Sequence, residues 1–358
     1  MDLGSTLRRG AIAVALAVMV AIPAGSTAAA SPTACKVKNV TRGGTYTSLG
    51  AAVKNARNGN KLSVRGTCIT GRTLIAKRLT IYGVRNATSG PPTLRGTSWG
   101  PTLMIQGETS VIVKGLTIKG RKDVVLPANR RGGGIYVGEG CKLTLQNVTV
   151  KEFRSNGFGG GIATEGGTVR LLGTTRIQGN KAASGGGIWA SYAKIVMQGK
   201  SVVRWNKGDG IRSDGPVTMK WESAVSGNTG SGISGGDPTR LFDRASIHHN
   251  SERGIVGATA VLRNSAAVHH NSDGGIRAEA VELHDNATVR DNAADTGAGL
   301  LEFEALEMSG NATITGNTAK FNGGGLFHRS RATLTGVTCA PAPGANVYDN
   351  APNDCYDY

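Results

Sequence analysis

The sequence predicts an all-β protein, a right-handed parallel β-helix (a single-stranded solenoid) with a short N-terminal capping helix. Between Gly132 and Asn317, a glycine-rich step closing on an aliphatic residue recurs every 21 to 27 positions. An aliphatic or aromatic residue then stands three places before an asparagine, and the apolar residues of each unit lie at even offsets, as in strands. A fixed period of this length is typical of a solenoid, because one unit cannot bury its apolar face alone.

The repeated asparagines are interpreted as scaffold. Asparagine tolerates left-handed turns, and its amide can bond to the copy in the next coil, so the column predicts a ladder. The glycine-rich steps close at Ile135, Ile162, Ile188, Ile211, Ile233, Ile255, Ile276, Leu300 and Leu326. The asparagines are Asn156, Asn180, Asn206, Asn228, Asn250, Asn271, Asn292 and Asn317, and three places before them stand Phe153, Ile177, Val203, Val225, Ile247, Val268, Val289 and Ile314.

Three short strands are expected in each unit, broken by glycine and asparagine turns and paired in parallel with the coils above and below. One inward column, six places before the aliphatic residue, holds Leu171, Met197, Met219, Leu241, Leu262, Leu283 and Met308. A column of small residues, two places before it, holds Thr175, Ser201, Ser223, Ala245, Ala266, Ala287 and Ala312.

The first 30 residues have the pattern of a secretory signal peptide. Arg8 and Arg9 precede an apolar run over 11–22, and three alanines stand before Ser31, where the mature chain is expected to begin. The general secretory route is favoured over the twin-arginine route. No later apolar stretch reaches the roughly 18 residues of a transmembrane helix. The expected location is therefore extracellular or at the cell surface, and the expected state is a monomer.

The ends of a solenoid need covers, because exposed strand edges promote aggregation. Residues 31–60 are expected to form the N-terminal cap, 61–338 the β-helix and 339–358 the C-terminal cap. Leu49, Ala52, Val53 and Ala56 have the spacing of a short amphipathic helix, which Asn58-Gly59-Asn60 ends.

Five cysteines lie near the two ends, at positions 35, 68, 141, 339 and 355. Their positions predict disulfides Cys35–Cys68 and Cys339–Cys355, each tying down a terminal coil. Cys141 is left over on an alternating strand, which favours a buried unpaired thiol over a nucleophile. No spacing resembles a zinc site, so no metal and no cofactor are expected.

The repeats resemble those of a known family. The segments Phe153-Arg154-Ser155-Asn156 and Gly185-Gly186-Gly187-Ile188 look like the repeat of polymorphic outer-membrane proteins, and the wider architecture resembles the pectin-lyase-like superfamily over roughly residues 40 to 340. This resemblance implies architecture more than activity. The acidic cluster of a pectate-lyase-like calcium site and the adjacent Asp-Asp of polygalacturonases are not found here.

The charge balance favours an anionic partner. Lys and Arg outnumber Asp and Glu by 41 to 24, and by 39 to 23 without the first 30 residues. A basic surface attracts polyanions such as acidic polysaccharides, although the same charge also keeps a secreted rod soluble.

Two outward columns are the candidate binding surfaces. The first, one place after the inward aliphatic residue, is a predicted basic stripe of Arg154, Gln178, Arg204, Ser226, His248, His269, Arg290 and Thr315. The second follows each glycine step and offers Tyr136, Trp189, Arg212, Arg277 and Phe327 for stacking on sugars or bases. A stripe along a solenoid can bind an extended polymer, because both share a long axis.

The candidate catalytic residues are His248, His249, His269, His270 and Asp291. The second histidine of each pair and Asp291 fall on three consecutive coils, within about 5 to 10 Å of each other, where imidazole and carboxylate can act as general acid and base. Duplication of a repeat explains the His-His-Asn phrase as well. The prediction is a secreted β-helix that binds an acidic polysaccharide or other polyanion along a basic face. The alternatives are a polysaccharide lyase or other carbohydrate-active enzyme, and a passive rod.

Overall fold

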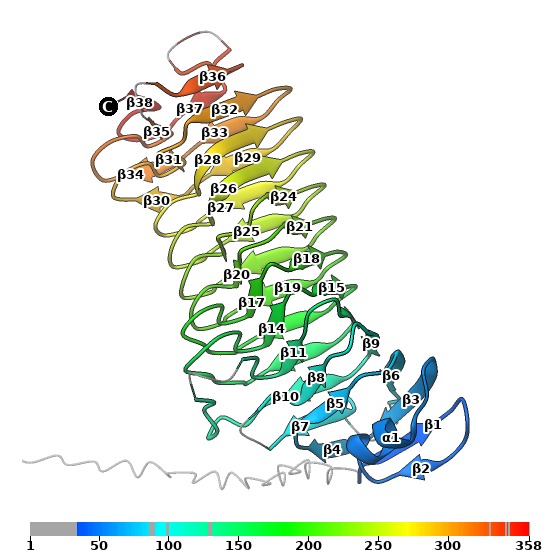
Figure 1. Ribbon diagram of the computed structural model, residues 1–358. Helices are drawn as coiled ribbons and strands as arrows, with labels where there is room; N and C mark the ends of the chain where they lie inside the picture. Colours follow the sequence, from blue (N-terminus) through cyan, green and yellow to red (C-terminus); the bar gives the residue numbers. More distant parts are fainter. Residues whose placement is uncertain are drawn as a thin grey trace, which may run out of the picture. The chain divides into compact units, whose positions relative to one another are not determined.

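The structure is a computed structural model that describes residues 34–85, 90–97, 100–127, 131–328, 331–340, 342 and 344–357. The chain divides into two units, 1–31 and 32–358, and all described residues belong to the second. The predicted signal peptide at 1–30 lies outside the described residues. Within the second unit, the strands stack as successive coils of a parallel β-helix (Figure 1), which confirms the predicted fold class.

Each coil contributes to three parallel ladders, as the even offsets of the apolar residues predicted. The first ladder is a separate twelve-stranded sheet of β4 (Thr67–Thr70), β7 (Thr93–Gly96), β10 (Thr117–Lys119), β13 (Thr149–Lys151), β16 (Arg176–Gln178), β19 (Val202–Arg204), β22 (Ala224–Ser226), β25 (Ser246–His248), β27 (Ala267–His269), β29 (Thr288–Arg290), β33 (Thr313–Thr315) and β37 (Val347–Tyr348).

The other two ladders merge where β26 (Ile255–Leu262) and β28 (Ile276–Leu283) run through the corner between them. The second ladder also contains β5 (Thr73–Ile75), β8 (Leu103–Ile105), β11 (Ile135–Val137), β14 (Ile162–Glu165), β17 (Ile188–Ser191), β20 (Ile211–Ser213), β23 (Ile233–Ser234), β31 (Leu300–Leu301), β35 (Leu326–His328) and β38 (Cys355–Asp357). The third also contains β3 (Asn60–Arg65), β6 (Leu79–Gly83), β9 (Ser110–Lys114), β12 (Lys142–Gln146), β15 (Thr168–Leu172), β18 (Lys194–Met197), β21 (Val217–Met219), β24 (Thr239–Leu241), β32 (Ala305–Met308) and β36 (Thr333–Thr335).

The interior is one continuous apolar core. The predicted inward columns are confirmed, since the Leu/Met column and the column of small residues are both buried. Two members of the small column, Ser201 and Ser223, have buried hydroxyls without a hydrogen-bond partner among the described residues.

The predicted asparagine ladder is confirmed for all but one of its members. In each coil, the backbone N–H and the side-chain Nδ2 of the asparagine both donate to Oδ1 of the asparagine in the next coil, with Nδ2–Oδ1 distances of 2.9 to 3.1 Å. The ladder consists of the buried Asn180, Asn206, Asn228, Asn250, Asn271, Asn292, Asn317 and Asn350.

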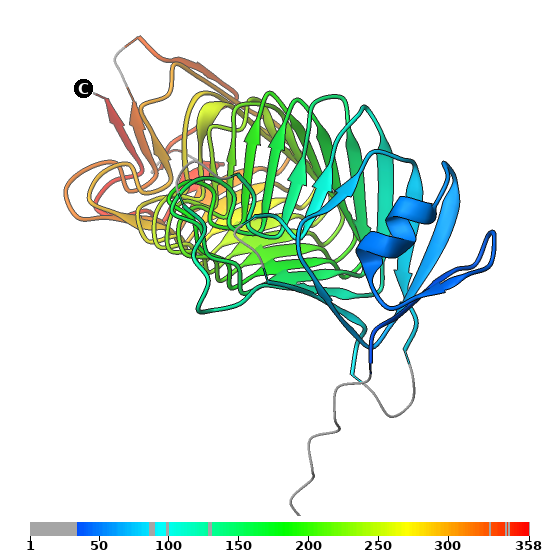
Figure 2. The same cartoon turned by 60° about the horizontal axis from the view of Figure 1, so that its bottom comes forward.

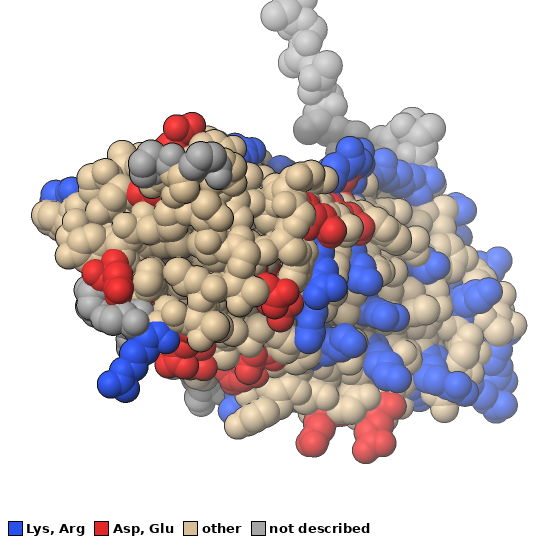
Figure 3. Space-filling view, turned by 90° about the horizontal axis from the view of Figure 1, so that it is seen from above, with Lys and Arg blue, Asp and Glu red and all other residues tan. Residues whose placement is uncertain are grey.

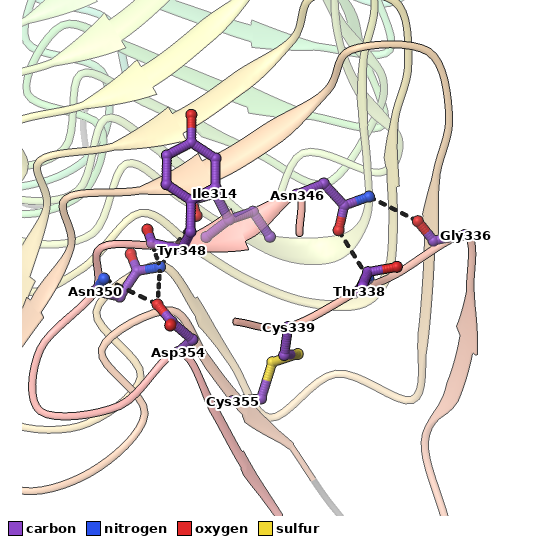
Figure 4. The surroundings of a disulfide bond; sticks show 9 residues. All are labelled: Ile314, Gly336, Thr338, Cys339, Asn346, Tyr348, Asn350, Asp354 and Cys355. Carbon is purple, nitrogen blue, oxygen red and sulfur yellow. Dashed lines mark hydrogen bonds between the residues drawn. A yellow bond between two sulfur atoms is a disulfide. The ribbon is translucent and has the colours of Figure 1, made fainter. Parts of the chain in front are cut away.

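The last rung of the ladder is closed by a carboxylate. Oδ1 of Asp354 accepts hydrogen bonds from both the N–H and Nδ2 of Asn350, each at 2.9 Å, in the place of a further asparagine (Figure 4). The neighbouring Cys339–Cys355 disulfide joins this segment to the loop that contains Cys339. The C-terminal coil is therefore closed by both a covalent bond and a polar cap.

The N-terminal end is covered as predicted. Helix α1 (Leu49–Asn55) begins at Ser48, whose side chain accepts a hydrogen bond from the N–H of Ala51, and it buries Leu49, Ala52 and Val53. The antiparallel strands β1 (Lys36–Asn39) and β2 (Thr45–Tyr46) flank it, and β1 also pairs with β3. Figure 2 shows α1 lying across the first coils.

Both predicted disulfides are present, Cys35–Cys68 with a Cα–Cα distance of 4.5 Å and Cys339–Cys355 with 6.2 Å. Cys141 is unpaired and buried, as predicted. The remaining short strands, β30 (Ala293–Ala294) and β34 (Thr318–Ala319), pair with each other beside the last coils.

Candidate functional site

The first ladder carries the predicted outward column, but with a corrected membership. Consecutive coils pair Arg95, Lys119, Lys151, Gln178, Arg204, Ser226, His248, His269, Arg290 and Thr315 in parallel register. The predicted Gln178, Arg204, Ser226, His248, His269, Arg290 and Thr315 all share this column. Arg154 does not belong to it.

The prediction for Arg154 was wrong because Phe153 does not occupy the position of the repeated aliphatic residue. Val150 pairs with Ile177, so Phe153 stands where the next coil has Asn180. Phe153 is buried, and its N–H donates to Oδ1 of Asn180 at 3.2 Å. Asn156 is consequently exposed and outside the ladder. A phenylalanine three places before an asparagine has the repeat's spacing, and only the strand register distinguishes the two alignments.

Arg154 instead begins a second line of cations, beyond the asparagine turn. It pairs in parallel with Lys181, and Lys181 pairs with Lys207. With Lys122, Glu152 and Trp205, these residues line an open hollow of about 280 Å³. Among the described residues, no carboxylate oxygen lies within 4 Å of the charged nitrogens of Arg154, Lys181 or Lys207. The cations of this hollow are therefore available to an external anion.

Glu152 is the acidic member of the hollow, and it is already neutralised. Its carboxylate lies 3.4 Å from Nζ of Lys119 and 3.3 Å from Nζ of Lys151. Burial alone would raise the pKa of Glu152, but the two ammonium groups outweigh burial and lower it. The carboxylate orders these lysines and leaves the three-coil line of cations without an opposing charge.

Trp205 places an aromatic ring at the edge of the same hollow. Its backbone is in the left-handed region (φ +53°) and its side chain is 60% exposed. The guanidinium carbon of Arg204 lies 3.8 Å from the ring centroid. Nε of Arg204 also donates a hydrogen bond to Oε1 of Gln178 at 3.1 Å, which helps to orient the guanidinium group. Burial, and then the charge of Arg176, lower the pKa of Arg204. A tryptophan in this conformation is rare, because the left-handed region disfavours bulky residues.

The next coil makes room for this tryptophan. Gly227 is the residue opposite Trp205 in the next coil, directly after the pair Arg204 and Ser226. A Cβ atom at Gly227 would lie 2.7 Å from Cδ1 of the indole. The ring therefore leans over the following coil beside a glycine, with the guanidinium of Arg204 against it. Aromatic and guanidinium planes of this kind bind sugar rings or bases.

The charge of the chain is divided unevenly between its two halves. Residues 31–180 contain 23 Lys and Arg and 5 Asp and Glu, whereas residues 181–358 contain 16 and 18. Figure 3 shows Lys and Arg gathered on the right, where the first coils lie in Figure 1, and acidic groups mostly elsewhere. We name the cluster of Lys119, Lys122, Lys151, Arg154, Lys181, Arg204 and Lys207 with Trp205 the basic face.

The four predicted histidines come together further along the column, as a two-by-two cluster. Nδ1 of His248 lies 2.8 Å from Nδ1 of His249, and the same distance separates His269 and His270. Rings stack between the coils, with centroids 4.9 Å apart for His248 and His269 and 5.0 Å for His249 and His270. Asp291 lies on the next coil, with Oδ2 4.0 Å from Nε2 of His270.

His248 and His269, the two histidines of the column itself, do not extend its positive charge at neutral pH. Burial, with the neighbouring imidazoles, lowers the pKa of His248 to about 4; burial, with His248 and Arg290, lowers that of His269 to about 3. Arg290 is compensated by Asp291, since NH1 donates to Oδ2 at 2.5 Å. The uncompensated stripe is therefore shorter than predicted and ends near Arg204.

The second predicted column does not form a continuous binding stripe. Trp189 is packed against Phe158 (centroids 4.8 Å apart) and beneath Arg131, and the Tyr136 hydroxyl donates to Glu165 at 2.6 Å. Arg212 donates to Ser234 at 3.2 Å. Arg277 is paired with Glu302 at 2.6 Å, in a hollow that Glu279 and Glu304 also line, and Phe327 stacks on Tyr356. The ring faces and guanidinium groups of this column already have partners within the protein.

Sequence reasoning missed the lysines of the basic face, although two signals for them exist. A lysine follows the ladder asparagine in two consecutive units, at Lys181 and Lys207, and the excess of basic residues is confined to the first half of the chain. No group of three or more His, Cys, Asp or Glu in the described part of the chain is arranged to hold a metal ion. No helix in that part is long and apolar enough to cross a membrane.

Comparison with known proteins concerns the fold. No protein-family model and no curated protein match the sequence. Among solved structures, the chain is similar to the A-module of the mannuronan C-5 epimerase AlgE6 of Azotobacter vinelandii, with 15% identity and a TM-score of 0.48. The match covers 86% of this chain and 93% of that one. The resemblances to the pectin-lyase-like superfamily and to polymorphic outer-membrane proteins stay predictions, and the function has to be argued from this chain's own side chains.

Proposed function

We propose that this protein is an extracellular β-helix that binds an acidic polysaccharide, or another polyanion of similar charge spacing, along the basic face. The observation that supports this most is the line Arg154, Lys181 and Lys207. Three cations follow each other at the coil spacing of about 4.8 Å, without a carboxylate partner among the described residues.

A linear polymer suits this surface better than a small anion. The cations are distributed along the axis of the solenoid, so a chain lying along that axis meets one cation per coil, and several weak contacts add up. The exposed ring of Trp205 beside Arg204 adds a stacking surface for a sugar ring. The hollow is open, as binding in the middle of a long chain requires.

An extracellular location is part of the proposal. Two disulfides close the terminal coils, and disulfides persist in oxidising compartments. The predicted signal peptide at 1–30 and the predicted monomeric state agree with this proposal and have their own tests, namely N-terminal sequencing of the exported protein and light scattering.

The test compares salt-dependent retention on an immobilised polyuronate between matched variants. The binding variant carries Lys181→Gln, Arg204→Gln and Lys207→Gln. The control carries Arg240→Gln, Lys320→Gln and Arg331→Gln, which remove the same charge from exposed positions in the second half of the chain. Because each exposed ion pair contributes about 0.5 kcal/mol, the binding variant should lose on the order of tenfold in affinity at low salt.

The control should elute close to the wild type. An equal loss of affinity in the two variants would show that binding depends on net charge and not on the basic face, which would contradict the proposal. The proposal would also be rejected if the wild type were not retained at low salt, because screening is weakest there. A neutral polysaccharide of the same length serves as the matched ligand control and should not be retained.

The second candidate function is a carbohydrate-active enzyme, and the histidine cluster is the observation that favours it. His248 and His269 are uncharged at neutral pH, because burial lowers their pKa values to about 4 and about 3, and an uncharged imidazole is a proton acceptor. Asp291 lies on the next coil, with Oδ2 4.0 Å from Nε2 of the neighbouring His270. Incubation with acidic polysaccharides, followed by assay of new reducing ends and of unsaturated products, tests this candidate. A product that disappears with His248→Ala and His269→Ala would establish it, and binding without product would support the proposal above.

A further inference from the structure

The two His-His pairs have a geometry that a surface turn does not require. In each pair, the first histidine is the last residue of a strand, and the second is the next residue, in the turn. The two Nδ1 atoms of a pair lie 2.8 Å apart. The ring planes within a pair are nearly perpendicular, at 85° and 84°. The arrangement occurs twice, on adjacent coils that pair His248 with His269.

The backbone pays for this arrangement with strain. His249 and His270 have φ values of +55° and +54°, in the left-handed region. The same position in other coils is glycine at 179, 227 and 316, which adopts this conformation freely, and Trp205, Asp291 and Asp349 in the remaining coils of the ladder. Backbone strain of this kind tends to be kept at functional sites. Other residue types also occupy this turn, so the feature to be explained is the pairing of two imidazoles on each of two adjacent coils.

We propose that each pair, His248 with His249 and His269 with His270, chelates a divalent transition-metal ion through its two Nδ1 atoms. Metal–imidazole bonds are about 2.0–2.1 Å long, so two nitrogens at right angles around one ion lie about 2.9 Å apart. The observed separation of 2.8 Å is close to that value. A tetrahedral angle would need a separation of about 3.4 Å. Cu²⁺ and Ni²⁺ accept square-planar nitrogen ligands at about this separation, and they are the ions proposed for these pairs.

The surroundings provide the rest of such a site. Without a metal ion, each contact is a hydrogen bond that needs a proton on one Nδ1; on binding, that proton moves to Nε2 and both rings stay neutral. Oδ2 of Asp291, which accepts a hydrogen bond from Arg290, lies 4.0 Å from Nε2 of His270, so this carboxylate is the group nearest to the protonated nitrogen of that ring in the proposed site. Water completes the coordination, because each pair supplies only two protein donors.

The two ions would not bind equally. The stacked rings place the pairs about 5 Å apart, so two dications would repel each other across the surface. The first equivalent should therefore bind more tightly than the second.

The test is a calorimetric titration of the untagged mature protein with CuCl₂, NiCl₂ and ZnSO₄, accompanied by electron paramagnetic resonance of the copper form. The decisive variant carries His249→Gly and His270→Gly, which removes one donor from each pair while restoring the residue that the turn prefers. We expect at least a tenfold loss of Cu²⁺ affinity with an unchanged or higher melting temperature. The control is His284→Ala, which removes an imidazole outside the cluster and should bind like the wild type.

The copper spectrum of the wild type should show coupling to nitrogen, which the double glycine variant should weaken. A second variant, His248→Ala with His269→Ala, leaves both strained residues in place and should lose the metal as well. The proposal is overturned if the wild type does not bind Cu²⁺, or if the double glycine variant binds it with the wild-type affinity.

Discussion

Replacing one asparagine of the ladder with alanine should destabilise the protein far more than replacing an asparagine that has the repeat's spacing but lies outside the ladder. Asn250 is buried in the middle of the ladder. Its Oδ1 accepts from the N–H and Nδ2 of Asn228 at 3.1 and 2.9 Å, and its Nδ2 donates to Val225 O at 3.3 Å and to Oδ1 of Asn271 at 3.0 Å. Asn250→Ala deletes all four hydrogen bonds.

The expected magnitude follows from these contacts. Four hydrogen bonds contribute about 1 kcal/mol each, and the buried N–H of Asn228, left without its acceptor, costs about 1–2 kcal/mol more. The free energy of unfolding should therefore fall by about 5–6 kcal/mol. Asn156→Ala is the matched control, because Asn156 has the repeat's spacing but is exposed and outside the ladder; its effect should stay within about 0.5 kcal/mol.

The assay is urea denaturation followed by far-ultraviolet circular dichroism, with tryptophan fluorescence as a second probe. Similar midpoints for the two variants would refute the reasoning, because they would mean that the ladder amides contribute no more than solvated ones. Asn250→Asp provides an isosteric check: it keeps the acceptor but loses the Nδ2 donor, so it should be destabilised at neutral pH as well.

Three further predictions test other parts of the molecule. Ser223→Ala should raise the stability by about 1 kcal/mol in urea denaturation, because the buried hydroxyl has no partner and later coils have alanine at this position; a loss would show that the hydroxyl is satisfied. Trp205→Gly should leave the melting temperature equal or higher while weakening retention on polyuronate, and unchanged retention would exclude the ring from the binding surface. Burial raises the pKa of Asp209 above its usual 3.8, so its ionisation should reduce stability as the pH rises from about 3.8 through the raised value. Asp209→Asn should abolish that component and show a smaller fall in melting temperature over this window, and an identical pH profile would contradict the assignment.

Much of the scaffold could be predicted because it depends on local and periodic signals. Alternation of apolar residues identifies which side chains point inward, whatever the exact path of the turns. All the ladder asparagines except Asn350, the capping helix over Leu49–Asn55 and the two terminal disulfides followed from spacing and position alone. In a solenoid each unit meets only its neighbours, so a pattern that holds in one unit holds in the next.

The candidate sites depended on the register between coils, which the sequence alone leaves open. Phe153 and Asn156 have the spacing of the repeat, yet strand pairing aligns Val150 with Ile177, which moves Arg154 out of the predicted stripe and next to Lys181. The histidines were predicted to be neighbours, but their Nδ1 distances and lowered pKa values come from packing. By itself, therefore, the sequence determined the periodic interior, where burial acts on every unit alike. Only the tertiary structure decided which polar side chains meet on the outside, because that depends on turn lengths and left-handed residues that periodicity does not encode.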